Sequence, residues 1–140
     1  MDWKLELVLV PVSDVDRAKD FYAEKVGFTV DVDHSAGEAF RVVQLTPPGS
    51  ACSISIGTGI TDAAPGSVRG LHLVVADIEA AGGQLSARGV EVGEIHHFES
   101  GERMPGPHPQ RRDYESFLPF GDPDGNGWVV QEVGHRKPQA

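Results

Sequence analysis

Two stretches of the chain repeat one pattern of apolar and polar positions. The first, Leu5 to Phe28, has an alternating apolar run, an aspartate, apolar residues at helical spacing and a glycine before the next extended run. The second begins at Gly70 and follows the same order. Asp14 and Asp77 hold equivalent places and predict helix N-caps, because a carboxylate there accepts a hydrogen bond from a free backbone amide. The repeat therefore predicts two copies of one supersecondary unit.

Alternation of apolar and polar residues predicts the strands, since successive side chains of a strand point to opposite faces. We expect strands at 5–12, 28–33, 40–45 and 51–56, and again at 71–75, 90–95, 116–120 and 128–133. Helical spacing predicts helices between the caps and the glycines at 27 and 89. The predicted fold class is α+β, built from two βαβββ modules in tandem. Module one spans 4–57, a Gly-, Ala-, Pro- and Ser-rich linker spans 58–69, and module two spans 70–134.

The second module is longer than the first, and the extra residues fall at 99–115. This insertion is polar and contains proline, glycine and charges of both signs. A long loop between two strands is either a lid over a site or ordinary surface. The sequence leaves both interpretations open.

Composition and charge limit the kinds of molecule that the protein is expected to bind. The chain has 140 residues and a formal net charge of −9, which argues against nucleic-acid binding because that requires a basic surface. An acidic surface is compatible with a cationic ligand. No apolar run reaches membrane-spanning length, so no membrane partner is expected. The absence of a signal-peptide pattern and the single cysteine, Cys52, predict a cytoplasmic protein.

Two segments, VPVSDVDRAKDFYAEKVGF and FGDPDGNGWVVQEV, resemble the vicinal oxygen chelate superfamily. That superfamily includes glyoxalase I, extradiol dioxygenases, fosfomycin-modifying enzymes and bleomycin-resistance proteins. The resemblance runs from Lys4 to Val133. It implies that the two modules form a half-barrel-like mixed sheet with a central cavity, and that the protein is a homodimer. Metal-dependent members hold a divalent ion through four His, Glu or Gln side chains on cavity-facing strand positions.

Those four ligand positions carry over one at a time. The first-strand position, seven residues before the cap aspartate, is Leu7, and its partner in module two is Gly70. The last-strand position is Val129, and its partner in module one is Ser53. Because none of these is a good ligand, the resemblance implies no standard metal site, and no cofactor is expected. A divalent metal would need displaced ligands, for which the candidates are His72, His97 and His108.

Strand parity selects the residues expected to line the cavity. His72 has the parity of Gly70, so it is the candidate catalytic group, as acid or base, although a strand histidine is also commonly a packed residue. The aromatic Tyr114 lies where the insertion returns to the sheet. The residues expected to contact a ligand are Leu7, Leu9, Ser53, Ser55, His72, His97, Tyr114, Val129 and Gln131.

Two functions fit this pattern. The first is a glyoxalase/bleomycin-resistance-like protein that binds a small apolar or aromatic molecule, with a cationic one favoured by the acidic charge, and so confers antibiotic resistance without turnover. The second is an enzyme of glyoxalase type. It would be a metal-dependent lyase, isomerase or dioxygenase with displaced ligands, or a metal-free catalyst that uses His72.

Overall fold

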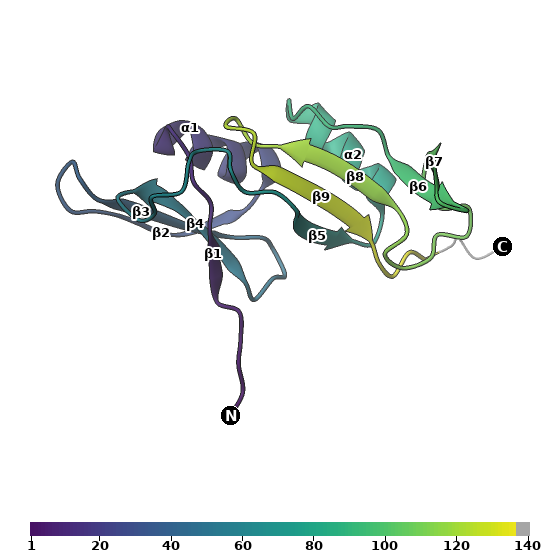
Figure 1. Cartoon of the computed structure of the whole chain (residues 1–140), viewed down its shortest axis with the longest axis horizontal. Helices are drawn as coiled ribbons and strands as arrows, with labels where there is room; N and C mark the ends of the chain where they lie inside the picture. The colour runs from purple at the N-terminus through teal and green to yellow at the C-terminus, as the bar shows by residue number, and fades with distance from the viewer. Residues whose placement is uncertain (137–140) are drawn as a thin grey trace. The chain divides into compact units, whose positions relative to one another are not determined.

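The computed structural model describes residues 1–136 and confirms the α+β class. The chain forms two compact units (Figure 1). Unit 1 comprises residues 1–68 together with the turn 122–126, and unit 2 comprises residues 69–121 and the residues that follow the turn. Each unit has its own sheet, so the backbone hydrogen bonds form two mixed sheets.

Unit 1 has the predicted βαβββ order. Its sheet runs β1-β4-β3-β2, with β1 parallel to β4 and the other pairs antiparallel. The helical segment packs on one face of this sheet, over Val43, Leu45, Ile54 and Ile56. The elements are β1 (Leu7–Leu9), α1 (Val15–Asp20), η1 (Phe21–Val26), β2 (Thr29–Ser35), β3 (Arg41–Thr46) and β4 (Ser53–Thr58).

The helix of unit 1 begins where the sequence predicts. The Asp14 side chain accepts a hydrogen bond from the Arg17 amide at 3.1 Å, which caps the first turn. After six residues the α-helix widens into a π-helical segment, which the apolar spacing does not predict. The segment ends at Gly27, whose φ of 93° is left-handed and favours glycine.

The turn 122–126 is built into unit 1 by hydrogen bonds. The buried Asp122 carboxylate accepts from the Tyr22 hydroxyl at 2.8 Å, from the Asn126 side-chain amide at 2.7 Å and from the backbone amides of Asp124 and Asn126, both at 2.9 Å. Asn126 also donates to the Pro11 carbonyl at 2.8 Å. The two segments that carry the family resemblance are therefore bonded to each other.

Unit 2 repeats the plan with one additional strand. Its sheet runs β5-β9-β8-β6-β7, with β5 parallel to β9. Asp77 caps α2 by accepting from the Ala80 amide at 3.0 Å. The buried face of the sheet, formed by Leu118, Phe120, Trp128 and Val130, is covered by α2. The elements are β5 (Leu71–Val75), α2 (Ile78–Ala87), β6 (His96–Glu99), β7 (Glu102–Pro105), β8 (Phe117–Gly121) and β9 (Gly127–Glu132).

Two predicted strands differ from the structure. The expected strand at 90–95 is wrong: only Val92 makes an isolated bridge, and the strand lies at 96–99. The Gly93 amide donates to the Pro119 carbonyl at 2.8 Å, but Pro119 has no amide hydrogen to donate in return, so the pairing does not extend beyond the isolated bridge. The first strand is shorter than predicted, at Leu7–Leu9, and the segment 99–115 contains β7. Within residues 1–136, no helix is both long and apolar enough to span a bilayer.

Candidate functional site

The sheet of unit 1 has an open face on the side away from its helix. β1 and β4 run in parallel register, which places Leu7 beside Ser53 and Leu9 beside Ser55. Ser55 in turn pairs with Gln44 of β3. These side chains point away from the helix because their neighbours Ile54 and Ile56 pack under it. The four residues predicted from module one therefore lie together on this face.

A row of hydrogen bonds crosses the open face of unit 1. The Thr46 hydroxyl contacts Asp31 on β2 and lies 2.6 Å from the Ser53 hydroxyl, which accepts from the Gln44 amide at 3.3 Å. The Ser55 hydroxyl is buried and has no hydrogen-bond partner among the described residues. The face is thus polar over β4, β3 and β2, beside Leu7 and Leu9 on the edge strand β1, and Asp31 and Gln44 were not among the predicted residues.

Unit 2 has a corresponding open face, on which two rows of side chains cross its strands. In the first row, Val74, Gln131, Phe117 and His96 are successive cross-strand neighbours. In the second row, His72, Val129 and Pro119 are successive neighbours. The structure thus brings three predicted residues, His72, Val129 and Gln131, onto one face.

The register corrects the alignment of the metal-ligand positions. Leu7 pairs with Ser53 in unit 1, and the residue that pairs with Val129 in the same way is His72, not Gly70. Counting back from the cap fails in unit 2 because His72 lies five residues before its cap, Asp77, whereas Leu7 lies seven residues before Asp14. His72 is exposed, and its Nδ1 donates to the Gly70 carbonyl at 2.6 Å. Across residues 1–136, no three His, Cys, Asp or Glu side chains are grouped to hold a metal ion.

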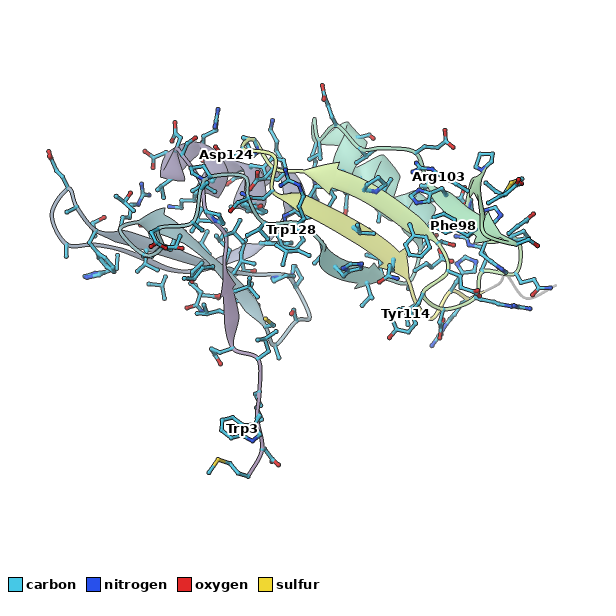
Figure 2. The ribbon with its side chains drawn as sticks, viewed as in Figure 1. Trp3, Phe98, Arg103, Tyr114, Asp124 and Trp128 are labelled. Carbon is cyan, nitrogen blue, oxygen red and sulfur yellow. The ribbon has the colours of Figure 1, made fainter. Side chains whose placement is uncertain are left out.

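An aromatic cluster lies at one end of the first row. The His96 ring stacks on Phe117, with centroids 5.5 Å apart and planes at 23°, and meets Phe98 edge-on at 5.6 Å. Phe98 and Phe117 are 5.7 Å apart. Phe98 remains half exposed on β6 (Figure 2). The sequence analysis missed His96 and Phe98, although the alternation in the segment HHFE places the two on one face.

His97 lies on the opposite side of β6 from His96, so it does not join the predicted set. Its Nδ1 donates to the Gly106 carbonyl at 2.7 Å, and its Nε2 is 3.0 Å from a Glu99 carboxylate oxygen. These two acceptors raise the pKa of His97 above its ordinary value. His108 lies edge-on at a ring distance of 5.8 Å. A hollow of about 270 Å³ opens here, lined by Glu99, His108, Pro109, Gln110 and Arg112.

The segment 108–116 is anchored to unit 2 by buried contacts. Arg111 donates through Nε and Nη2 to both oxygens of the fully buried Glu132, at 2.7 and 2.6 Å. Glu132 also accepts from the Ile78 amide at the start of α2, at 2.9 Å. The Tyr114 amide donates to the Glu132 carbonyl at 2.8 Å, and the exposed Tyr114 ring lies outside both rows. These contacts favour a fixed surface loop over a moving lid.

Unit 1 contains a second hollow of about 270 Å³. It lies between the start of α1 and the linker, and its walls come from residues 11–15 and 57–65. None of the residues predicted to contact a ligand lines it. The candidate functional residues therefore lie on the open sheet face of unit 1 and on that of unit 2.

Comparisons with known proteins give a family and a relative of similar length. A family model described as the glyoxalase/bleomycin resistance protein/dioxygenase superfamily matches residues 4–130. The chain is 28% identical over 129 residues to the uncharacterized protein YetH of Bacillus subtilis (strain 168), covering 89% of this chain and 94% of that protein.

Solved structures have the same fold. TnmS3, an antibiotic binding protein from Streptomyces sp. CB03234, is 34% identical with a TM-score of 0.73, and the match covers 94% of this chain and 96% of that one. A member of the glyoxalase/bleomycin resistance protein/dioxygenase superfamily from Sphaerobacter thermophilus DSM 20745 is 26% identical with a TM-score of 0.73, covering 94% and 98% of the two chains.

Proposed function

The chain belongs to the glyoxalase/bleomycin resistance protein/dioxygenase superfamily, and on that premise we propose that it binds a small apolar or aromatic molecule on its open sheet faces without turning it over. The main support for this proposal is the chemistry of the four positions where metal-dependent members of the superfamily place metal ligands. Leu7, Ser53 and Val129 offer no strong donor, and only His72 is a ligating type. Leucines, hydroxyls and aromatic rings instead suit an organic ligand.

The similarity to TnmS3 supports an antibiotic-like natural product as the ligand class, because the likeness covers nearly both chains. The net charge of −9 favours a cationic member of that class. Binding of this kind would give resistance by sequestration and would leave the molecule chemically unchanged.

Calorimetric titration tests this function, with bleomycin and the planar cation proflavine as probes. We expect saturable, stoichiometric binding of at least one probe, recovered intact by mass spectrometry. Leu7→Arg should abolish binding because it places an unpaired cation on the open face of unit 1. Leu5→Arg is the matched control, since Leu5 lies outside β1 and is already exposed. If neither probe binds to saturation, the proposal is wrong.

One observation favours the second candidate, an enzyme. His72 is exposed on the open face, and with Nδ1 bonded to Gly70 its Nε2 remains available to a substrate. Elemental analysis after incubation with Mn, Fe, Co, Ni and Zn, followed by glyoxalase and dioxygenase assays, tests this candidate. A stoichiometric metal or a turnover rate that is lost in His72→Ala would establish it over simple binding.

We also propose a cytoplasmic homodimer. Apolar side chains outside the proposed ligand surface remain exposed, among them Trp3, Val30 and Val32 of unit 1, and a second copy would cover such surface. Light scattering coupled to size exclusion should give twice the chain mass of 15.0 kDa. A free Cys52 is consistent with a reducing compartment.

A further inference from the structure

We propose that His96, Phe98 and Phe117 on the open face of unit 2 bind the aromatic part of the ligand, and that Nε2 of His96 accepts a hydrogen bond from it. The ligand class that follows is a planar aromatic carrying a phenolic hydroxyl or an N–H group. This inference rests on the proposed binding function and specifies which ligands the open face of unit 2 selects.

The three rings form a contiguous aromatic surface. Their centroids form a triangle with sides of 5.5, 5.6 and 5.7 Å, in which Phe117 is nearly parallel to His96 and Phe98 is at right angles to it. Phe98 itself is half exposed, so it has surface left for another ring. Aromatic rings prefer offset-stacked or edge-to-face partners at such separations. The cluster therefore offers a planar ligand both orientations without rearrangement.

Hydrogen bonding assigns the role of His96. Its Nδ1 lies 3.0 Å from the Glu94 carbonyl, which can only accept, so Nδ1 carries the hydrogen. In the neutral ring Nε2 is then an acceptor. Among the described residues no group bonds to Nε2. The 8% of the His96 surface that remains exposed limits its solvation, so a ligand donor is the natural partner.

A second acceptor lies in the same row. Gln131 is the cross-strand neighbour of Phe117 on the side away from His96. Its Nε2 donates to the Tyr114 carbonyl at 3.2 Å, which fixes the amide orientation and leaves Oε1 without a partner in the described part of the chain. Acceptors thus flank Phe117 on both sides. This arrangement favours aromatic molecules whose polar groups are donors.

The test uses two probes that differ only in the donor, 2-naphthol and 2-methoxynaphthalene, titrated calorimetrically into the intact protein. We expect 2-naphthol to bind about five- to tenfold more tightly, the effect of one net hydrogen bond. His96→Phe keeps a ring in the stack and removes the acceptor, so it should abolish that preference. His34→Phe, on exposed β2, is the matched control and should keep it. Phe98→Ala should weaken both probes.

A measurement on unmutated protein covers the case in which a variant fails to fold. In protein labelled with ¹⁵N-histidine, 2-naphthol should shift the Nε2 resonance of His96, and 2-methoxynaphthalene should not shift it by hydrogen bonding. Equal affinities for the two probes, an unmoved His96 resonance, or no binding of either probe would overturn the inference. Continued binding of bleomycin or proflavine in that event would show that the proposed function stands without this subsite.

Discussion

In each unit an arginine donates two hydrogen bonds to a single carboxylate, and the two pairs differ in burial. In unit 1, Arg41 donates to both oxygens of Asp33 at 3.0 and 2.9 Å, and about a quarter of each side chain is exposed. In unit 2, Arg111 grips Glu132 at 2.7 and 2.6 Å, and Glu132 is fully buried. The same chemical contact is therefore placed in two different dielectric surroundings.

The difference shows what each pair does for its unit. A partly exposed pair such as Arg41–Asp33 exchanges hydration for a modest attraction, so its net contribution to stability is small. A buried carboxylate cannot recover its hydration when its partner is lost, so removal of that partner is costly. Arg111 adopts a left-handed φ of 51°, a conformation that non-glycine residues keep only when their surroundings enforce it. The buried pair is thus one of the contacts that hold the segment 108–116 in place, together with the bond from the Tyr114 amide to the Glu132 carbonyl.

The largest effect is expected from Arg111→Met. It removes the cation that bonds both oxygens of the buried Glu132 carboxylate and leaves only the Ile78 amide at 2.9 Å and His135 Nδ1 at 3.6 Å, so it should lower the free energy of unfolding by about 3–5 kcal/mol. Denaturant unfolding followed by circular dichroism measures the change. Arg112→Met is the control, because Arg112 is exposed and its ion pair with Glu115 is long at 4.0 Å. This substitution should change the free energy of unfolding by less than about 0.5 kcal/mol. Similar losses in the two variants would contradict the role of burial.

Acid titration examines the same pair. Burial alone raises the pKa of Glu132, but hydrogen bonds from Arg111 and from the Ile78 amide outweigh it and hold that pKa below its ordinary value of 4.5. The folded state therefore binds this proton less readily than the unfolded state. The stabilisation is complete above pH 4.5 and is lost as pH falls through the lowered pKa. Glu132→Gln should flatten this acid limb of the unfolding free energy.

The next effect is expected in unit 1, from Asp122→Ala. This change removes the acceptor of four hydrogen bonds, which come from the Tyr22 hydroxyl, the Asn126 side-chain amide and two backbone amides of the turn. The loss should be about 2–4 kcal/mol. Tyr22→Phe removes one of those bonds without changing the ring, and should cost about 1 kcal/mol. Thermal unfolding of both variants gives the ratio, and an equal loss would show that the turn is held by something else.

The exposed pair should give a smaller effect. Arg41→Met removes the bonds to Asp33 and a contact of 2.7 Å with Asp16. Since Asp33 keeps Lys19 as a partner at 2.8 Å and is reached by water, the cost should be about 1 kcal/mol or less. It should shrink further in 1 M salt, whereas the Arg111→Met loss should change little. A loss as large as that of Arg111→Met would remove the distinction between the units.

The sequence predicted what local chemistry controls. The caps at Asp14 and Asp77 depend on bonds to residues three positions away, and both are confirmed. The strand β5 was predicted with its observed limits, Leu71–Val75, because a short, largely apolar run lies between Gly70 and the Asp77 cap. The βαβββ plan followed from the repeat and from the resemblance.

The open faces were harder to predict because they depend on register between strands distant in sequence. Counting from the cap selected Gly70 where the parallel pairing of β5 and β9 places His72. The strand β6 was expected at 90–95 but lies at 96–99, so His97 was assigned to the site and His96 was missed. A one-residue displacement of a strand reverses which side chains share a face, and no local pattern in the segment GEIHHFES fixes it.

The smallest effect on stability is expected from His97, which lies on the opposite side of β6 from His96. Nδ1 donates to Gly106 and Nε2 faces Glu99, so both contacts are hydrogen bonds only when the ring is protonated. Its pKa is raised above the ordinary 6.5. This contribution to stability is complete below pH 6.5 and is lost as pH rises through the raised pKa. Unfolding between pH 6 and 9 should show the decline, and Glu99→Gln should reduce it. If His97→Gln leaves the decline intact, another group is responsible. If His97→Gln removes the preference for 2-naphthol, the ligand binds on the His97 side of β6 and not on the His96 side.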